Sequence, residues 1–370
     1  MYPALTVAEQ FAAAPDEVTF VGTPDGLEAR IVPAAGVRFR PLAASGFDRA
    51  RPVTLVTSSL RIAASTVRAW RWLGAERPDA VIGFGGYVSI PVGLAAALRR
   101  VPLVLHEQNS VPGIANRVLS RFAEAVAVTY EESAPSFAHP GRVVVTGNPV
   151  RRAVLDADRD AGRRSLGLST DASVLLVFGG SRGARHLNSA LVALRDQLLA
   201  VPGLQIIHVA GKAEASSVSA ALYQSGGDGG GRWRVLEYLD DMGSALAACD
   251  LVVARSGATS IAEITALGLP SVLVPYPYAT DDHQTKNART LVAHGAAEVI
   301  ADADLDGQRF GDAVVRLLGD AEARATMAAA SRALGRPDAA SRVADLARSA
   351  ARRRVRAQDM RSDIPEDSVA

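Results

Sequence analysis

Short apolar runs that end in turn residues recur along the first part of the chain. An amphipathic opening segment carries Pro3 near its start, where a helix loses nothing from proline's missing N–H. Buried strands are predicted from the runs EVTFVGT, VRFRPLA, PDAVIGFGG, VPLVLHEQN, AVAVTY and RVVVTGNPV. Helical stretches separate most of these strands, which is typical of a parallel sheet with crossover helices.

A polar, charged stretch after Arg151 and Arg152 interrupts this pattern, which restarts at VLLVFGGSRGARHLN. Further strands are predicted from LQIIHVAG, WRVLEYL, LVVARSG, PSVLVPYP and AAEVI. The pattern therefore predicts an α/β protein with two doubly wound, Rossmann-like domains, at residues 1–150 and 151–335. A C-terminal helix over 336–355 is expected to pack back on the first domain. A disordered tail is expected over 356–370, because no apolar face continues there.

Charge and cysteine content narrow the class of protein. The 40 basic and 39 acidic residues give a net charge of +1, which offers no argument for a nucleic-acid partner. Cys249 is the single cysteine, so a disulfide framework and a cysteine metal cluster are excluded, and a reducing cytosol fits. The sequence has no apolar run of about 18 residues that could span a bilayer.

Three glycine-rich turns, IGFGGYVSIP, FGGSRGA and ARSGATSIAE, each join a predicted strand to a helix. Backbone N–H groups at such helix starts can bind an anion, although tight strand-to-helix packing explains any single turn equally well. Three turns together, with nearby hydroxyls, favour a phosphorylated ligand. None has the Gly-Lys-Ser/Thr ending of a P-loop ATPase. The glycines are Gly83, Gly85, Gly86, Gly179, Gly180, Gly183 and Gly257.

Ligands of doubly wound sheets bind at the carboxyl ends of the strands, so we expect a site in the cleft between the domains. Glu263 could interact favourably with the positive N-terminal end of the helix dipole, or it could accept hydrogen bonds from ribose hydroxyls. Gln284 carries an amide that can donate to and accept from a sugar. The neighbouring DDH lacks the spacing of known metal-ligand sets. The HEQN block, His106 to Asn109, is either a satisfied loop network or a ligand contact.

The segment LRIAASTVRAWRWLG combines apolar residues at helical spacing with flanking arginines. A core-facing helix commonly produces this pattern, and so does a helix that settles on an anionic membrane surface. The candidate membrane contacts are Leu60, Val67, Trp70, Leu73, Arg61, Arg68 and Arg71.

Five sequence blocks together resemble the peptidoglycan N-acetylglucosaminyltransferases, enzymes of the GT-B fold. The blocks are GFGGYVSIPVGLAA, LVLHEQNSVPGIANR, VVTGNPVR, FGGSRGARHLN and ARSGATSIAEITALGLPSVLVPYPYATDDHQTKNA. The resemblance implies transfer of N-acetylglucosamine from UDP-GlcNAc to the C4 hydroxyl of a muramyl sugar on an undecaprenyl-linked pentapeptide, giving lipid II. It further implies inversion at the anomeric carbon, no metal or cofactor, and a place on the cytoplasmic face of the membrane beside other cell-wall synthesis proteins.

Site residues follow from the same resemblance, position by position. Asn109 and Arg151 would contact the donor, Ser181 its diphosphate, the Leu239 backbone the uracil, Ala258 and Thr259 phosphate, Glu263 the ribose and Gln284 the sugar. These roles agree with the phosphorylated ligand that the glycine-rich turns at the helix starts predict.

The start of the chain departs from the family pattern. Family members begin with a strand and a turn of the kind GGTxGH, and neither is present before the Pro3 helix. We therefore expect the first, central strand of the N-terminal sheet to be missing, and we assign no catalytic base. One explanation is a start codon that lies upstream of Met1. Another is an inactive, truncated paralogue that binds UDP-sugar or acts as a scaffold. A third, a glycolipid synthase with another acceptor, is disfavoured by the HEQN and GFGGYVS blocks.

Overall fold

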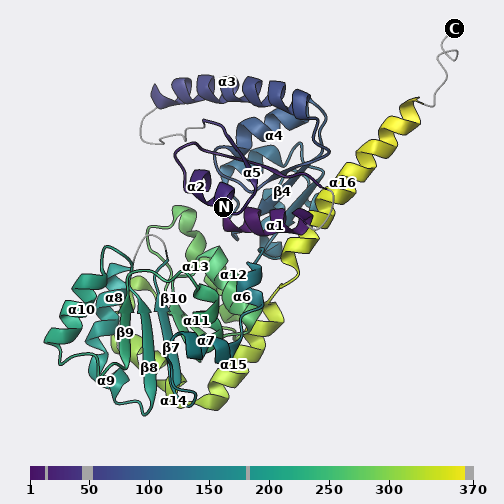
Figure 1. The fold of residues 1–370 in the computed structure, drawn as a ribbon. Coiled ribbons are helices and arrows are strands. Elements are labelled where there is room, and N and C mark those ends of the chain that lie inside the picture. Colours follow the sequence, from purple (N-terminus) through teal and green to yellow (C-terminus); the bar gives the residue numbers. More distant parts are fainter. Residues whose placement is uncertain (13–15, 44–52, 181–183, 363–370) are drawn as a thin grey trace, which may run out of the picture. The chain divides into compact units, whose positions relative to one another are not determined.

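The computed structural model describes residues 1–12, 16–43, 53–180 and 184–362, and the chain divides into two compact units (Figure 1). Unit 1 comprises Met1–Pro149 together with Asp338–Ala370, and unit 2 comprises Val150–Pro337. Every strand predicted from the apolar runs is present, which confirms the parallel α/β pattern in both units.

Unit 2 is built on a six-stranded parallel sheet. Its strands are β7 (Ser173–Phe178), β8 (Leu204–Val209), β9 (Trp233–Leu236), β10 (Leu251–Ala254), β11 (Ser271–Leu273) and β12 (Glu298–Val299). Their order across the sheet is β12-β11-β10-β7-β8-β9. The chain thus winds from the centre to one edge, returns beside β7 as β10, and continues to the other edge. This is the doubly wound arrangement, and its switch point lies between β7 and β10.

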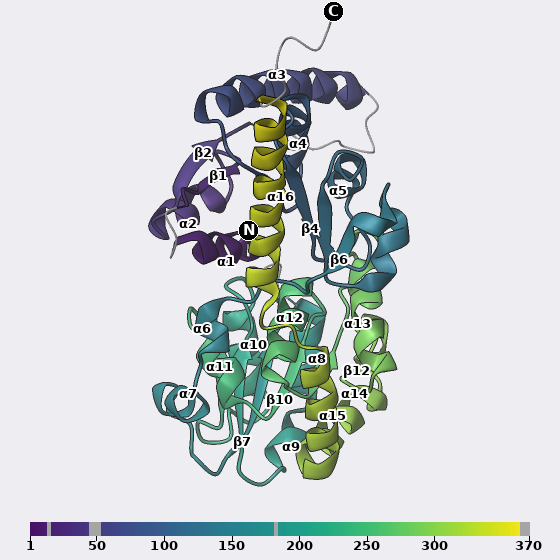
Figure 2. The ribbon, with the colours of Figure 1, turned by 90° about the vertical axis from the view of Figure 1, so that its right-hand side faces the viewer.

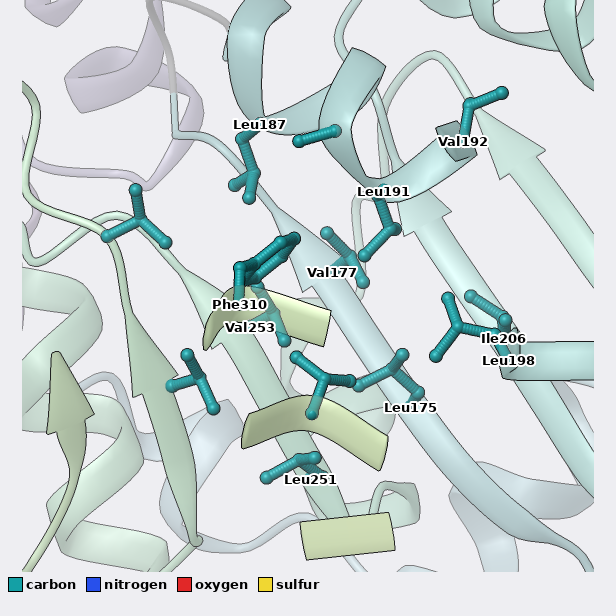
Figure 3. Packing of buried hydrophobic residues seen from close by; sticks show 14 of the residues in the cluster. Leu175, Val177, Leu187, Leu191, Val192, Leu198, Ile206, Leu251, Val253 and Phe310 are labelled. Carbon is teal, nitrogen blue, oxygen red and sulfur yellow. The ribbon is translucent and has the colours of Figure 1, made fainter. Parts of the chain in front are cut away.

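Helices cover both faces of this sheet. They are α6 (Arg152–Leu155), α7 (Arg159–Ser165), α8 (Arg185–Ala193), α9 (Arg195–Leu199), α10 (Ala215–Gln224), α11 (Met242–Ala248), α12 (Ala258–Leu267), α13 (His283–Ala293), α14 (Gln308–Gly319) and α15 (Ala321–Leu334). Leu175 and Val177 of β7 pack with Leu187 and Phe310 on one face (Figure 3). Leu176 packs in a second cluster on the other face. Burial on both faces explains why β7 is a continuous apolar run.

Unit 1 contains two separate parallel sheets. Strands β3 (Val81–Gly83), β4 (Leu103–Glu107), β5 (Ala125–Val128) and β6 (Val143–Val145) form one, and β1 (Thr19–Gly22) pairs with β2 (Arg38–Pro41) in the other. The helices that precede or connect these strands are α1 (Tyr2–Ala12), α2 (Glu28–Ala34), α3 (Val53–Glu76), α4 (Ser89–Leu98) and α5 (Ile114–Leu119). Helix α3 packs across α4 (Figure 1).

The strand order of unit 1 matches that of unit 2 with one position left out. In unit 2 the central strand β7 lies between β8 and β10. The corresponding neighbours in unit 1 are β1 and β3, which share no hydrogen bond among the described residues. Both strands instead line a cavity of about 1270 Å³, together with residues of α1 and α16. Among the described residues, the strands of unit 1 thus form two sheets with this cavity between β1 and β3.

Helix α16 (Ala339–Ser362) runs along unit 1, with α1, α2 and the β1–β2 pair to one side and α4, α5 and the larger sheet to the other in Figure 2. Val343 and Ala344 pack with Val7 of α1, and Ala347 packs on Val104 of β4. The helix extends to Ser362. The prediction of a disordered tail from residue 356 is therefore wrong for residues 356–362. Good helix formers without Gly or Pro propagate the helix past its packed part.

Candidate functional site

The switch point of unit 2 brings two of the glycine-rich turns to one edge of the sheet. One turn follows β7 and leads into α8, and the other follows β10 and leads into α12. Ligands of doubly wound sheets bind at this place, where neighbouring strands send their connections to opposite faces. Gly179 and Gly180 belong to the first turn. The predicted site residues Ser181 and Gly183 lie outside the described residues.

The N-terminus of α12 is an uncapped helix start. Gly257 is its N-cap residue, and no side chain caps the helix. Ala258 and Thr259 are half-buried, so the first N–H groups lie close to the surface. Gly257 has φ −67°, and an added Cβ would meet only Ser260 Oγ, at 3.9 Å. Neither the backbone nor internal packing requires glycine here, and the missing side chain leaves room for an anion to approach the helix start.

Arg151 and Glu263 form a buried ion pair beside this turn. Arg151 Nη2 lies 2.8 Å from Glu263 Oε1, and Arg151 Nε lies 3.2 Å from the same oxygen. Glu263 is 5% exposed. Burial raises the pKa of the Glu263 carboxyl, and the charge and hydrogen bonds of Arg151 offset only part of that effect. Among the described residues, nothing donates to Glu263 Oε2, which leaves this oxygen as an acceptor for a ligand.

Leu239 and Gln284 offer further polar groups in unit 2. Leu239 is half-buried against the apolar cluster under α11, and no described residue bonds to its backbone N–H or C=O. Gln284 Oε1 accepts from the backbone N–H of Tyr276 at 2.9 Å, and its carbonyl accepts from Ser256 Oγ at 2.9 Å. Within the described chain its amide nitrogen donates to no residue. Gln284 is therefore fixed in place with its donor end available.

The HEQN block of unit 1 is largely a satisfied loop network. Glu107 accepts from the backbone N–H groups of Asn109 and Gly113 and from Asn116 Nδ2, at 2.9–3.1 Å. His106 Nε2 lies 3.0 Å from the carbonyl of Gly147, and burial lowers the pKa of His106 to about 4. The ring is thus neutral at pH 7 and holds two loops together. Asn109 sits on this network, and its donor contact stays a prediction.

The glycines at the end of β3 and in the turn that leads to α4 have structural roles. A Cβ on Gly83 would lie 2.9 Å from Leu105 Cδ2, so strand packing excludes a side chain there. Gly85 and Gly86 have φ of +79° and +76°, which only glycine adopts readily. Packing and turn geometry account for these three positions without a ligand.

Helix α3 presents an exposed apolar stripe. The exposed fractions are 68% for Leu60, 50% for Val67 and 41% for Trp70. Leu73 is 2% exposed and packs with Ala69 and residues of α4, so its assignment as a membrane contact is wrong. At about 100° per residue, Leu73 lies on the face opposite Leu60. The core face is the one of Ala69 and Leu73, and Arg61, Arg68 and Arg71 are exposed beside the outer stripe.

Three charged residues at the switch point were not singled out from the sequence. Arg255 directly precedes the α12 turn and pairs with Asp302, which also contacts His186 at the start of α8. The separation of His186 and Asp302 along the chain hides this contact in the sequence.

In the described part of the chain, no group of three or more His, Cys or acidic side chains could hold a metal ion. No described helix has the length and apolar character needed to cross a bilayer.

Comparisons with known proteins identify the family of the chain. The glycosyltransferase family 28 N-terminal domain matches residues 1–128, and the C-terminal domain of that family matches residues 174–343. A "UDP-N-acetylglucosamine--N-acetylmuramyl-(pentapeptide) pyrophosphoryl-undecaprenol N-acetylglucosamine transferase" of Halothermothrix orenii is 41% identical, covering 91% of this chain and 92% of the relative. A protein of the same name from Desulforudis audaxviator is 43% identical and covers 94% of each chain.

Among solved structures, MurG of Acinetobacter baumannii is 30% identical, with a TM-score of 0.72 over 94% of this chain and 95% of that one. The two parallel-sheet units are thus the halves of a GT-B glycosyltransferase. The chain belongs to glycosyltransferase family 28.

Proposed function

We propose that the protein transfers N-acetylglucosamine from UDP-GlcNAc to the C4 hydroxyl of undecaprenyl-pyrophosphoryl-MurNAc-pentapeptide, with inversion, to give lipid II for peptidoglycan. Relatives that carry the name of this transferase are 41–43% identical over more than nine tenths of the chain. The structural observation that carries the proposal is the uncapped start of α12, with the buried carboxylate of Glu263 one helical turn further on.

The start of α12 suits the diphosphate of the donor. As the bond from the sugar to the diphosphate breaks, negative charge grows on UDP. The N–H groups of Ala258 and Thr259 and the positive end of the helix dipole stabilise this charge in fixed positions. This arrangement supplies the stabilisation in a metal-independent transfer. We assign no residue of this chain as the base that deprotonates the acceptor hydroxyl.

The remaining donor contacts follow from available polar groups. Glu263 Oε2 accepts from a ribose hydroxyl while Oε1 is held by Arg151. The free backbone groups of Leu239 match the hydrogen-bonding edge of uracil, and the Gln284 amide nitrogen donates to a sugar hydroxyl. Asn109 and Ser181 complete the proposed set on the strength of the family resemblance.

The lipid-linked acceptor requires access to a membrane surface. The outer stripe of α3 combines exposed apolar side chains with exposed arginines, as expected of a helix that lies in the interface of an anionic bilayer. We propose peripheral attachment to the cytoplasmic face of the cell membrane through this stripe. Association with other cell-wall synthesis proteins is consistent with such a location.

A transfer assay tests the proposed function. The purified chain is incubated with labelled UDP-GlcNAc and a short-chain polyprenyl-pyrophosphoryl-MurNAc-pentapeptide, and the disaccharide product is separated and sequenced by mass spectrometry. UDP-glucose serves as the control donor, and Glu263→Ala as the control variant. Tight binding of UDP-GlcNAc without transfer to this acceptor would contradict the proposed reaction and favour a binding protein. Absence of binding would contradict the donor site itself.

A further inference from the structure

His186 has both ring nitrogens next to carboxylates. Nδ1 lies 2.8 Å from Asp302 Oδ2, and Nε2 lies 3.2 Å from Asp306 Oδ2. A neutral imidazole has one donor and one acceptor, whereas a carboxylate only accepts. Both contacts can therefore be hydrogen bonds only when the ring carries two protons. The geometry describes an imidazolium held between two carboxylates, one from each side of the ring.

The charges around this ring are close to balanced. Asp302 and Asp306 come from the segment after β12, and Arg255 pairs with Asp302 from the far side at 2.5 Å. On α8 itself, the neighbouring Arg185 is paired with Glu214 at 3.0 Å. The positive end of the α8 dipole opposes a cation at this position. The hydrogen bonds to Asp302 and Asp306 raise the pKa of His186, and desolvation of the ring offsets only part of that rise.

Asp302 links this ring to the turn before α12. Its partner Arg255 has a buried side chain, and Arg255 Nη1 donates to the carbonyls of Val274 and Pro275 at 3.3 and 3.2 Å. The guanidinium lies 5.6 Å from the ring centre of Tyr276. Arg255 therefore fixes the end of β11 against the end of β10.

The same contacts continue to the proposed sugar-binding amide. The backbone N–H of Tyr276 donates to Gln284 Oε1, and Ser256 Oγ donates to the Gln284 carbonyl. A continuous series of contacts thus runs from His186 through Asp302 and Arg255 to both sides of the α12 turn. These contacts are the route by which a change at His186 would reach the α12 turn, and only a measured effect at the turn shows that the two are coupled.

We infer that His186 is a positioning residue for the donor site: its imidazolium fastens the Asp302–Asp306 segment to α8 and thereby holds Arg255 and the Ser256–Ala258 turn in the geometry that binds the donor diphosphate. This inference rests on the proposed function, which places the diphosphate at that turn. When the ring loses a proton, one nitrogen becomes an acceptor facing a carboxylate, and that contact is lost. Donor affinity then depends on pH through a group that does not touch the donor.

Calorimetric titration of the full chain with UDP-GlcNAc, from pH 5.5 to 8.5, tests the inference. UDP-GlcNAc is the right probe because its diphosphate is blocked at both ends, whereas free UDP has a terminal phosphate that titrates near pH 6. The wild-type affinity should fall about threefold to tenfold as the pH rises. His186→Gln should bind at pH 6 as weakly as the wild type does at pH 8.5, with a flat profile. Asp306→Asn, which keeps the Asp302 contact, should move the fall to lower pH.

His294→Gln is the matched control, because His294 is an exposed histidine of the same unit that contacts only the carbonyl of Thr290 among described residues. Its pH profile should equal that of the wild type. A flat wild-type profile, or a pH dependence that persists in His186→Gln, overturns the inference. Measurable binding that lacks this pH dependence leaves the donor site intact, so the two failures are distinguishable.

A second measurement does not depend on the donor. In the free protein at pH 6, hydrogen exchange of the Ile261 amide, which donates to the Gly257 carbonyl, and of the next amides of α12 should be faster in His186→Gln than in the wild type. At pH 8.5 the two proteins should exchange alike. Equal exchange at pH 6 would show that His186 does not support the turn, even if UDP-GlcNAc does not bind.

Discussion

Arg151 binds a single oxygen of Glu263, with Nη2 at 2.8 Å and Nε at 3.2 Å from Oε1. The arrangement puts the charge and both hydrogen bonds of the arginine on one oxygen of a buried carboxyl group. Burial alone would favour the protonated acid, and the arginine opposes this effect. Glu263 therefore has one oxygen held by the protein and one for a ligand.

Replacing Glu263 by Ala should weaken UDP binding about tenfold to a hundredfold, because hydrogen bonds to a charged group contribute about 1.5–3 kcal/mol. Calorimetry with UDP and with its 2′- and 3′-deoxy analogues measures the effect. The wild type should discriminate against at least one analogue, and the variant should lose that discrimination. Glu322→Ala, at an exposed position of the same unit, is the control. Equal affinities of wild type and Glu263→Ala for UDP would refute the ribose assignment.

Gly257→Ser should separate stability from binding. Serine is a good N-cap residue, so the melting temperature should stay equal or rise slightly. In the proposed donor site the added side chain would occupy the place of the phosphate at the α12 start, so UDP-GlcNAc affinity should fall at least tenfold. Gly319→Ser, at the exposed end of α14 where an added Cβ meets nothing within 4 Å, is the control and should leave binding unchanged. Unchanged donor affinity in Gly257→Ser would remove the α12 start from the donor site.

Acid should destabilise both units through two buried histidines. Burial lowers the pKa of His106 and of His208 to about 4, below the ordinary value of 6.5. Between these pH values the unfolded chain binds more protons than the folded one, so stability falls as the pH drops from 6.5 to 4. The loss is about 3 kcal/mol for each ring at the lower limit.

Thermal unfolding followed by calorimetry from pH 7 to pH 4 measures this acid sensitivity. His208→Gln keeps a donor for the Asn188 side chain and should reduce the acid sensitivity of unit 2. His294→Gln, at an exposed position, should not alter it. A melting temperature that is constant over this pH range would contradict the prediction.

Leu60→Ser and Val67→Ser together should reduce binding to vesicles that contain anionic phospholipid. Each removes exposed apolar area, worth about 25 cal/mol per Å² when buried in the interface. Co-sedimentation at low and high salt measures binding, and replacing Arg61 and Arg68 by Gln should remove the salt dependence. Leu27→Ser is the control, because Leu27 of the same unit has a similar exposed fraction, 64%. An equal loss of vesicle binding with Leu27→Ser would show that the protein does not bind the membrane specifically through the α3 stripe.

A strand supplied to the divided sheet should stabilise unit 1. From the strand rise, strand spacing and layer separation, one residue of a packed strand takes roughly 160 Å³, so the cavity of about 1270 Å³ has room for roughly eight residues. Fusing a short apolar strand and a glycine turn to Met1, which lines the cavity, should raise the melting temperature and slow amide exchange in β1 and β3. The same fusion with proline at its centre should not, because proline cannot donate to the ladder.

Much of the fold follows from local pattern. The strands were predictable because a parallel sheet buried on both faces needs continuous apolar runs, as in β7. Which face of α3 packs on the core could not be predicted, because leucine and tryptophan occur on both faces of that helix. Leu73 and Leu60 differ in burial although both looked equally apolar in the sequence.

Polar contacts between residues far apart in the chain also could not be predicted from the sequence. The sequence pointed to Arg151 and Glu263 separately, yet 112 positions separate them, and no local rule pairs them. His186 and Asp302 are 116 positions apart. Such pairs arise from strand order, which brings distant connections to one edge, and hydrophobic periodicity does not specify which side chains then meet.

The two ends of unit 1 have a consequence for synthesis on the ribosome. Arg348 of α16 donates to the carbonyl of Gln10, so the last helix completes a body begun by the first. Chains emerge from the N-terminus at about 5–20 residues per second. Val150–Pro337 therefore emerges ahead of α16, and the unit encoded second has all of its residues outside the ribosome before unit 1 does. Until α16 emerges, the apolar surfaces that it covers on α1 and β4 stay open to chaperones.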